Sequence, residues 1–208
     1  MREVKDAEIR RSQILDEAEE LFVTKGYNKT TVIDILDRVG IAKGTFYYYF
    51  KSKEEVMDQI IFRIVDRDVE KAKIILGDDK LGPIEKIQKI LMDQKPEIGD
   101  RKNKIIDQFH APGNAEMHQR SLVYSVKELS PVLAEVVKRG VDEGVFDTKY
   151  PLESVEFLMA AAEFIFDIGI CSWSQAELEK KARAFINTVE RVLGAKSGSF
   201  DGIIGVFS

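Results

Sequence analysis

Apolar side chains recur along most of this 208-residue chain at intervals of three and four residues, which is the spacing of an amphipathic helix. The first clear stripe predicts a helix over residues 8–25, and Gly26 follows where glycine often ends a helix. The stripe consists of Ile14, Leu15, Ala18, Leu21 and Phe22. Alternation with a period of two, which would indicate strands, is scarce, so the pattern predicts an all-α fold.

Two short helices are predicted to follow, over residues 31–40 and 42–50. Thr31 and Asp34 have the spacing of a capping box at the start of the first one. Gly40 ends that helix and provides a turn into the next. Two short helices around a tight turn are typical of a helix-turn-helix motif, whose second helix enters the major groove of DNA.

Ser52 and Glu55 repeat the capping-box spacing and open a long helix predicted over residues 52–76. Beyond it, prolines and glycines divide the chain into further helical stretches. These are predicted at 83–94, 98–111, 114–128, 131–139, 152–171 and 174–193. We expect about nine helices, arranged as a helix-turn-helix domain, a second helical domain and a C-terminal tail. The expected boundaries of these three parts are 1–51, 52–193 and 194–208.

Composition narrows the class of protein. Hydrophobic residues make up 44% of the chain and charged residues 32%, which allows a buried core beneath a charged surface. The single cysteine, Cys171, excludes an internal disulfide framework and favours a reducing compartment. The charged N-terminus lacks the apolar segment of a secretory signal, and no apolar run reaches the length of a membrane span. We therefore expect a cytoplasmic protein.

Charge is distributed unevenly along the chain. The net charge is −5, yet residues 1–53 carry ten Lys or Arg and nine Asp or Glu. Within them, the stretch "KGTFYYYFKSK" (43–53) contains three lysines and no acidic residue. A local basic patch on an acidic chain is compatible with nucleic-acid binding, although it does not require it.

The aromatic run inside 43–53 separates into two faces when it is wound as a helix. At about 100° per residue, Phe46, Tyr49 and Phe50 fall within one arc, which is expected to pack on the first helix. The other face is expected to point outward, where hydroxyl groups can donate to phosphates and a lysine can donate to guanine. It contains Lys43 at the tip, Gly44, Thr45 and Tyr48, with Tyr47 on the flank.

The segment from about Ile9 to Val56 resembles the N-terminal domain of the TetR family of bacterial transcriptional regulators. The resemblance is carried by the Gly-aromatic pair after the first helix, the Thr-Val start of the second, the glycine turn and "KGTFYYYF" with a lysine beyond it. It implies binding to a double-stranded DNA operator, no catalytic residues and no cofactor. The DNA-binding residues that it implies are Thr31, Lys43, Gly44, Thr45, Tyr47, Tyr48 and Lys53.

A weaker resemblance to the same family covers residues 133–159 and leads into the last two helices. The stretch "FLMAAAEFIFDIGI" (157–170) is apolar around much of its circumference, so it needs burial on more than one side. By resemblance, these helices pair two subunits as a homodimer, and the helices between about 52 and 135 enclose a small, largely apolar effector. The candidate effector-binding residues are Phe109, His110, Met117, Tyr124, Met159 and Phe164.

Other functions compete with that of a transcriptional repressor. The sequence has no Gly-x-Ser-x-Gly, no P-loop and no cluster of metal ligands, so we do not expect an enzyme. His110 and His118 alone are a weak signal for a metal. The alternatives are a TetR-like DNA-binding adapter without an effector and a helical interaction module without DNA binding. The sequence does not identify where the apolar tail "GAKSGSFDGIIGVFS" (194–208) packs.

Overall fold

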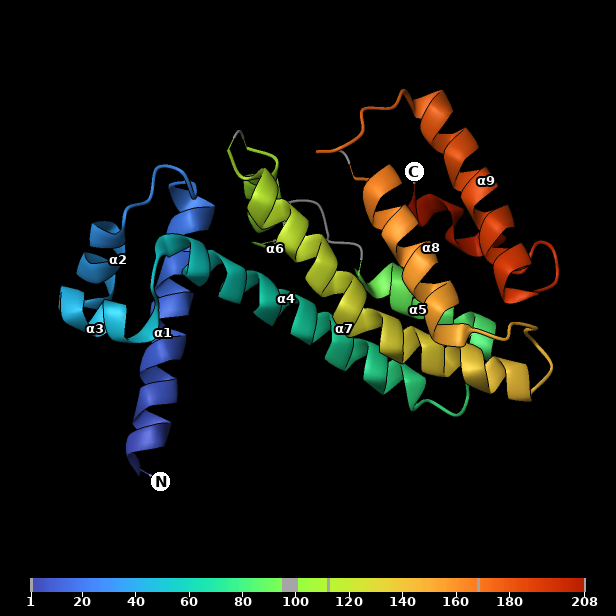
Figure 1. The fold of residues 1–208 in the computed structure, drawn as a ribbon, viewed down its shortest axis with the longest axis horizontal. Coiled ribbons are helices and arrows are strands. Elements are labelled where there is room, and N and C mark those ends of the chain that lie inside the picture. Colours follow the sequence, from blue (N-terminus) through green and yellow to red (C-terminus); the bar gives the residue numbers. More distant parts are fainter. Residues whose placement is uncertain (1, 95–100, 112, 168, 208) are drawn as a thin grey trace. The chain divides into compact units, whose positions relative to one another are not determined.

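A computed structural model describes the chain except for residues 1, 95–100, 112, 168 and 208 and the side chains of residues 2–5 and 109. Every regular element in the described part is a helix, as the sequence predicts (Figure 1). The chain forms two compact units. The first comprises Met1–Ile64 and Glu97–Ser121, and the second comprises Val65–Pro96 and Leu122–Ser208. Two helices, α4 (Lys53–Leu76) and α7 (Ala115–Asp142), begin in the first unit and end in the second.

The first unit is built on α1 (Arg2–Thr24), α2 (Val32–Val39) and α3 (Lys43–Tyr49), with α6 (Arg101–Phe109) packed against α1. α1 begins six residues before its predicted start. Burying a large apolar side chain contributes about 1.5–3 kcal/mol to the free energy of folding. The fully buried side chains at the centre of this small unit therefore contribute strongly to its stability. The side chains there with at most 1% exposure include Ile14, Ala18, Phe22, Ile35, Phe46 and Phe50.

Capping interactions fix the starts of α2 and α4. Thr31 Oγ1 accepts the backbone N–H of Asp34 at 3.1 Å, and the Asp34 carboxylate accepts the backbone N–H of Thr31 at 2.7 Å. At the start of α4, Ser52 Oγ accepts the N–H of Glu55 at 3.2 Å. The Glu55 carboxylate reaches one residue further back than a capping box does, to the N–H before Ser52 at 2.6 Å. Both predicted helix starts are therefore confirmed.

The predicted break between residues 128 and 131 is wrong. α7 continues through Pro131, although proline removes one helical hydrogen bond. Pro131 faces solvent, so the carbonyl that loses its partner can be hydrated, while the residues on either side are buried and hold the helix in place. The buried residues around it are Leu129, Ser130, Val132, Leu133, Val136 and Val137.

The helix predicted over 152–171 is shorter than expected, because α8 (Pro151–Ile165) ends six residues earlier. The Asp167 carboxylate accepts the backbone N–H groups of Gly169 at 2.7 Å and Ile170 at 3.0 Å. Trp173 Nε1 donates to the carbonyl of Ile165 at 2.8 Å. Side chains thus satisfy the backbone groups that further helix would have paired, which the apolar pattern alone does not reveal.

The second unit combines the later parts of α4 and α7 with α5 (Pro83–Gln94), α8, α9 (Gln175–Leu193) and the 3₁₀ helix η1 (Asp201–Val206). Its core is formed by buried aliphatic residues together with two phenylalanines, Phe146 and Phe200. η1 packs against α5 and α9, so the apolar tail docks on helices of its own chain. None of the helices in the described residues is long and apolar enough to cross a membrane.

Candidate nucleic-acid interface

α3 presents two different faces, as its sequence predicts. Phe46 and Phe50 are 0% and 1% exposed, whereas Tyr47 and Tyr48 are 48% and 79% exposed. Tyr49 is half-buried and meets Tyr48 edge to face, with 4.9 Å between ring centres. The buried phenylalanines anchor the helix, and the exposed tyrosines are left available to a ligand outside the protein.

The N-terminal end of α3 is open and positively charged. Lys43 is exposed, and its Nζ lies 5.9 Å from the ring centre of Tyr47. A Cβ added to Gly44 would meet no atom within 4 Å, so packing inside the protein does not demand glycine there. Its missing side chain instead leaves room for close approach from outside. Thr45 is half-buried beside it.

The start of α2 carries the exposed Thr31, predicted to contact the DNA backbone. Its neighbour Asp34 also accepts from Lys25 Nζ at 2.6 Å. Lys25, followed by the Thr31 backbone and hydroxyl groups, lowers the pKa of Asp34 from 3.8 to about 2. The N-terminal end of α2 is therefore fixed by a charged capping interaction that stays ionised at neutral pH.

Lys53 has a structural role that sequence reasoning missed. Its Nζ donates to the carbonyls of Tyr27 and Thr30, both at 2.8 Å, and lies 4.1 Å from the ring centre of Tyr27. Burial lowers the pKa of Lys53. The ammonium group thereby ties the start of α4 to the loop between α1 and α2. An ammonium group has three N–H donors, and these two carbonyls accept from two of them. A contact between the third donor and a DNA phosphate stays a prediction.

α6 belongs to the same compact unit as the helix-turn-helix and is joined to it by polar contacts. Gln108 Oε1 accepts the backbone N–H of Tyr27 at 2.9 Å, in the loop that follows α1. Arg101 pairs with Glu19 at 2.7 Å and with Glu20 at 2.8 Å, both on α1. Glu19 is only 6% exposed and also accepts from Arg63 on α4 at 2.8 Å. α1, α4 and α6 are therefore tied together around one buried carboxylate.

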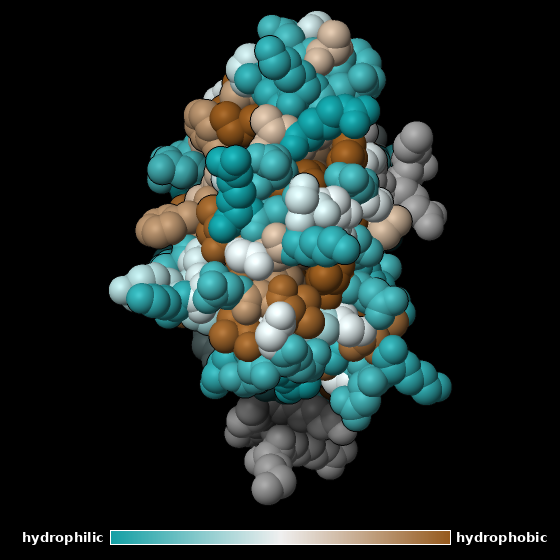
Figure 2. All heavy atoms as spheres, turned by 90° about the vertical axis from the view of Figure 1, so that its right-hand side faces the viewer, coloured by the Kyte–Doolittle hydropathy of each residue, from teal (hydrophilic) through white to brown (hydrophobic). Residues whose placement is uncertain are grey.

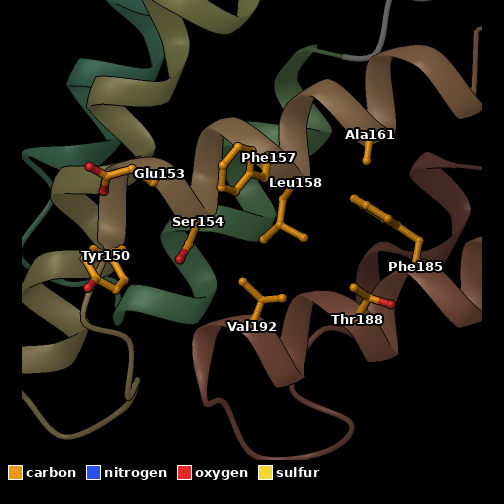
Figure 3. A pocket seen from close by; sticks show the side chains of 9 residues that line it. All are labelled: Tyr150, Glu153, Ser154, Phe157, Leu158, Ala161, Phe185, Thr188 and Val192. Atoms are coloured by element: carbon orange, nitrogen blue, oxygen red, sulfur yellow. The ribbon is translucent and has the colours of Figure 1, made fainter.

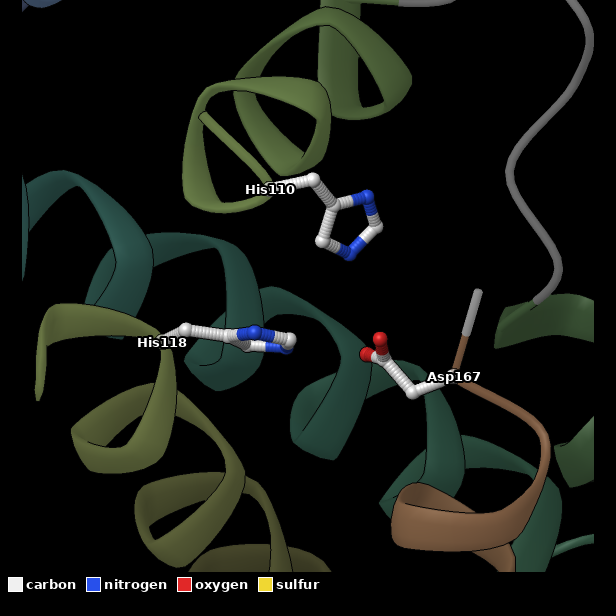
Figure 4. Close-up of side chains that lie close together, drawn as sticks. All are labelled: His110, His118 and Asp167. Carbon is white, nitrogen blue, oxygen red and sulfur yellow. The ribbon is translucent and has the colours of Figure 1, made fainter. Parts of the chain in front are cut away.

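The candidate effector-binding residues are divided between the two compact units. In the first unit, the rings of His110 and His118 are 5.1 Å apart (Figure 4), and Met117 is buried. In the second unit, Met159 is buried and accepts from Ser130 Oγ at 3.3 Å, whereas Phe164 is 54% exposed on α8.

The two remaining candidates are Tyr124 and Phe109. Tyr124 donates to Asp66 at 2.9 Å, and burial, followed by that carboxylate, raises the pKa of Tyr124 to about 12. The side chain of Phe109 lies outside the described residues. The effector assignments for all six residues stay predictions.

An apolar groove of about 680 Å³ lies between α8 and α9 in the second unit (Figure 3). None of the six effector candidates lines it. Phe157 is one of its lining residues and is 74% exposed. On the face drawn in Figure 2, brown apolar side chains gather among teal polar ones. Because the sequence predicts that α8 and α9 pair two subunits, we call its lining the pairing face: Tyr150, Glu153, Ser154, Phe157, Leu158, Ala161, Phe185, Thr188 and Val192.

Sequence reasoning selected the two helices of this groove but missed its individual residues. The signal was available, because Phe157, Ala161 and Phe164 follow a helical spacing away from the buried Val155 and Met159. A second apolar stripe on one helix indicates a second packing partner. Which stripe faces the chain's own core could be decided only from the folded structure.

Comparison with known families matches both parts of the chain. Residues 14–60 match the model of bacterial regulatory proteins of the tetR family. Residues 98–188 match the model of the tetracyclin repressor-like C-terminal domain. The first match covers the helix-turn-helix, and the second runs from the N-terminal side of α6 into α9.

Characterised relatives support the same assignment. The chain is 30% identical over 139 residues to the HTH-type transcriptional repressor KstR2 of Mycobacterium tuberculosis, covering 66% of this chain and 69% of the relative. It is 23% identical over 154 residues to the HTH-type transcriptional regulator TtgR of Pseudomonas putida, covering 69% and 73%. Both relatives are named as regulators of transcription.

Solved structures share the fold. SmeT, the repressor of the Stenotrophomonas maltophilia multidrug efflux pump SmeDEF, superimposes with a TM-score of 0.59 at 22% identity, covering 91% of this chain and 92% of SmeT. RolR in complex with resorcinol gives 0.64 at 17% identity, covering 99% and 96%. With the helix-turn-helix geometry, both family matches and the 30% identity in agreement, the chain belongs to the TetR family and is a DNA-binding transcriptional regulator.

Proposed function

We propose that this regulator is a cytoplasmic repressor that binds a palindromic operator as a homodimer and is released by a small, largely apolar effector. The observation that carries the proposal is the outward face of α3. Exposed Lys43, Gly44, Tyr47 and Tyr48 stand above buried Phe46 and Phe50. This DNA-reading surface (Lys43, Gly44, Thr45, Tyr47 and Tyr48) combines a cation, hydroxyl donors and an open backbone, which suit base edges and phosphates.

A second copy of the chain is the proposed occupant of the pairing face. One recognition helix reads few base pairs, so useful specificity calls for two of them on two half-sites. The groove is apolar, and its rim exposes Phe157 and Val192 at 74% and 39%. Apolar surface of this kind is costly to leave in water and favours association with an identical surface.

Release by an effector requires that ligand binding change the placement of the recognition helices. α6 contacts the loop after α1 through Gln108, and α4 and α7 run from the first unit into the second. A ligand that prefers one arrangement of these helices lowers DNA affinity by its ratio of affinities for the two arrangements. Fold neighbours are described with triclosan, resorcinol and stearoyl-CoA, all of which have apolar parts, and this supports an apolar effector here.

DNA binding is tested by fluorescence anisotropy with DNA from upstream of the protein's own gene, at several salt concentrations. Contacts with phosphates predict a steep loss of affinity with salt. The substitution Tyr47→Ala should weaken binding sharply and leave the helical circular dichroism unchanged. Unchanged affinity in a normally folded variant would refute the role of the DNA-reading surface.

Effector release is tested separately, by adding a panel of small apolar compounds to the preformed complex with DNA. A compound that frees the operator supports the repressor with an effector. If none of a broad panel changes DNA binding, the release step fails and the DNA-binding adapter becomes the better description.

A further inference from the structure

We propose that the C-terminal segment 199–207, called the brace below, positions the pairing face and thereby strengthens subunit pairing. The proposal rests on the homodimer proposed above. The brace contains η1 and lies against α5 and α9 of its own unit. It contributes no residue to the groove lining itself, so its effect on pairing would be indirect.

The first half of the brace is anchored firmly in the second unit. Phe200 is fully buried and stacks on Phe146, with ring centres 6.3 Å apart and an angle of 12° between the planes. Its backbone N–H donates to Glu190 at 3.1 Å, and Gln88 Nε2 donates to the carbonyl of Ser199 at 2.9 Å. Glu190 is only 5% exposed, so the hydrogen bond from Phe200 satisfies a buried carboxylate and holds this segment on α9.

The second half of the brace completes an aromatic cluster. The Phe207 ring centre lies 4.9 Å from that of Phe166 and 5.1 Å from that of Phe185. Phe166 and Phe185 are themselves 5.5 Å apart. Phe166 caps the end of α8 and Phe185 belongs to α9, so Phe207 links these two helices through one ring.

Phe185 connects the brace to the pairing face. It packs on Phe207 and also lines the groove. Without Phe207, Phe185 and Phe166 lose a packing neighbour, and the side chains at this site relax into the vacated volume. A pairing face whose shape changes fits its copy less well, and fit at the centre of an interface governs affinity more than area does.

The test compares the full chain with two variants, one ending at Gly205 and one with Phe207→Ala. Both keep the Phe200 anchor, so the second unit retains its core. Sedimentation equilibrium should show the dimer dissociation constant rising about tenfold in both variants, because Phe185 loses the packing that fixes its place in the pairing face. Operator affinity should fall at protein concentrations near that constant and recover well above it.

Controls separate positioning from simple stability. Phe207→Leu keeps apolar bulk and should restore most of the pairing, and Asp201→Asn on the exposed side of η1 should change nothing. A lower melting temperature with an unchanged dimer dissociation constant would mean that the brace only fills the core of its own unit. A full chain that is monomeric refutes the homodimer and the brace together, whereas a dimer that ignores both brace variants refutes the brace alone.

Discussion

Two surfaces of this protein expose aromatic rings, and they differ in the polar atoms that accompany those rings. On α3, Tyr47 and Tyr48 carry hydroxyl groups and lie beside Lys43. On α8, Phe157 and Phe164 have no polar atom, and they are 74% and 54% exposed. Exposure alone therefore does not reveal the kind of partner that a surface binds.

The difference indicates which kind of partner each surface can bind. Tyrosine and lysine donors match the phosphates and base edges of DNA, and their hydration is replaced by hydrogen bonds on binding. Phenylalanine rings gain only by leaving water, so they match another apolar surface. The first two of the following predictions each break one of these matches and leave the other intact. The last two concern the stability of the DNA-binding unit, and all four run from the largest expected effect to the smallest.

The largest effect is expected from a charge on the pairing face. Phe157→Glu would bring two carboxylates into a buried apolar contact, and we expect the dimer dissociation constant to rise by more than about 100-fold. Analytical ultracentrifugation measures it. Ile74→Glu is the matched control, because Ile74 is equally exposed at 75% and lies on α4, outside the groove. Equal loss of pairing in both variants would contradict this assignment of the interface.

Removing the cation from the DNA-reading surface should give the next largest effect. Lys43→Ala is expected to weaken operator binding by about 10- to 100-fold, the range of one good contact with a base. Dimerisation should not change. Lys89→Ala, an exposed lysine on α5, serves as the control in anisotropy titrations. Similar losses for the two lysines would indicate general charge attraction without a specific contact at α3.

A substitution of Lys53 distinguishes a role of this residue in folding from a role in DNA binding. Lys53→Met removes two hydrogen bonds to the carbonyls of Tyr27 and Thr30, and we expect a loss of about 1–3 kcal/mol in the free energy of unfolding. Urea unfolding followed by circular dichroism measures this loss. If stability is unchanged while DNA affinity falls, Lys53 acts mainly on phosphates and its contacts in the free protein are incidental.

The smallest effect concerns the cap of α2 and depends on pH. The pKa of Asp34 is about 2 in the folded protein and 3.8 ordinarily, so the stability contributed by the ionised carboxylate is present above about pH 4. It is lost as pH falls from 4 towards 2. The stability difference between wild type and Asp34→Asn, measured by urea unfolding, should therefore shrink over that range. A difference that stays constant with pH would show that the charge of Asp34 is unimportant.

The recognition helix could be predicted almost completely from the sequence. Its positions follow from the helical period, and the rings of Phe46 and Phe50 are buried as the period requires. The capping residues Thr31 and Ser52 likewise mark their helix starts, because capping is a local interaction. Local geometry dominates in both cases, so a single sequence is sufficient.

Interactions between distant residues were not predictable in the same way. Lys53 was assigned to DNA, yet its partners are 26 and 23 residues away along the chain, and the sequence does not bring them together. Pro131 was assigned to a break, yet long-range packing of its neighbours keeps α7 intact. In both cases tertiary contacts outweighed the local preference.

The sequence by itself determined the all-α class, the helix-turn-helix and the identity of the family, because these depend on periodicity and on short motifs. Only the tertiary structure decided where the C-terminal tail lies, which stripe of α8 faces outward, and which α1 groups α6 contacts. The physical reason is that an apolar or polar side chain signals a need for a partner. The folded chain determines which partner comes within reach.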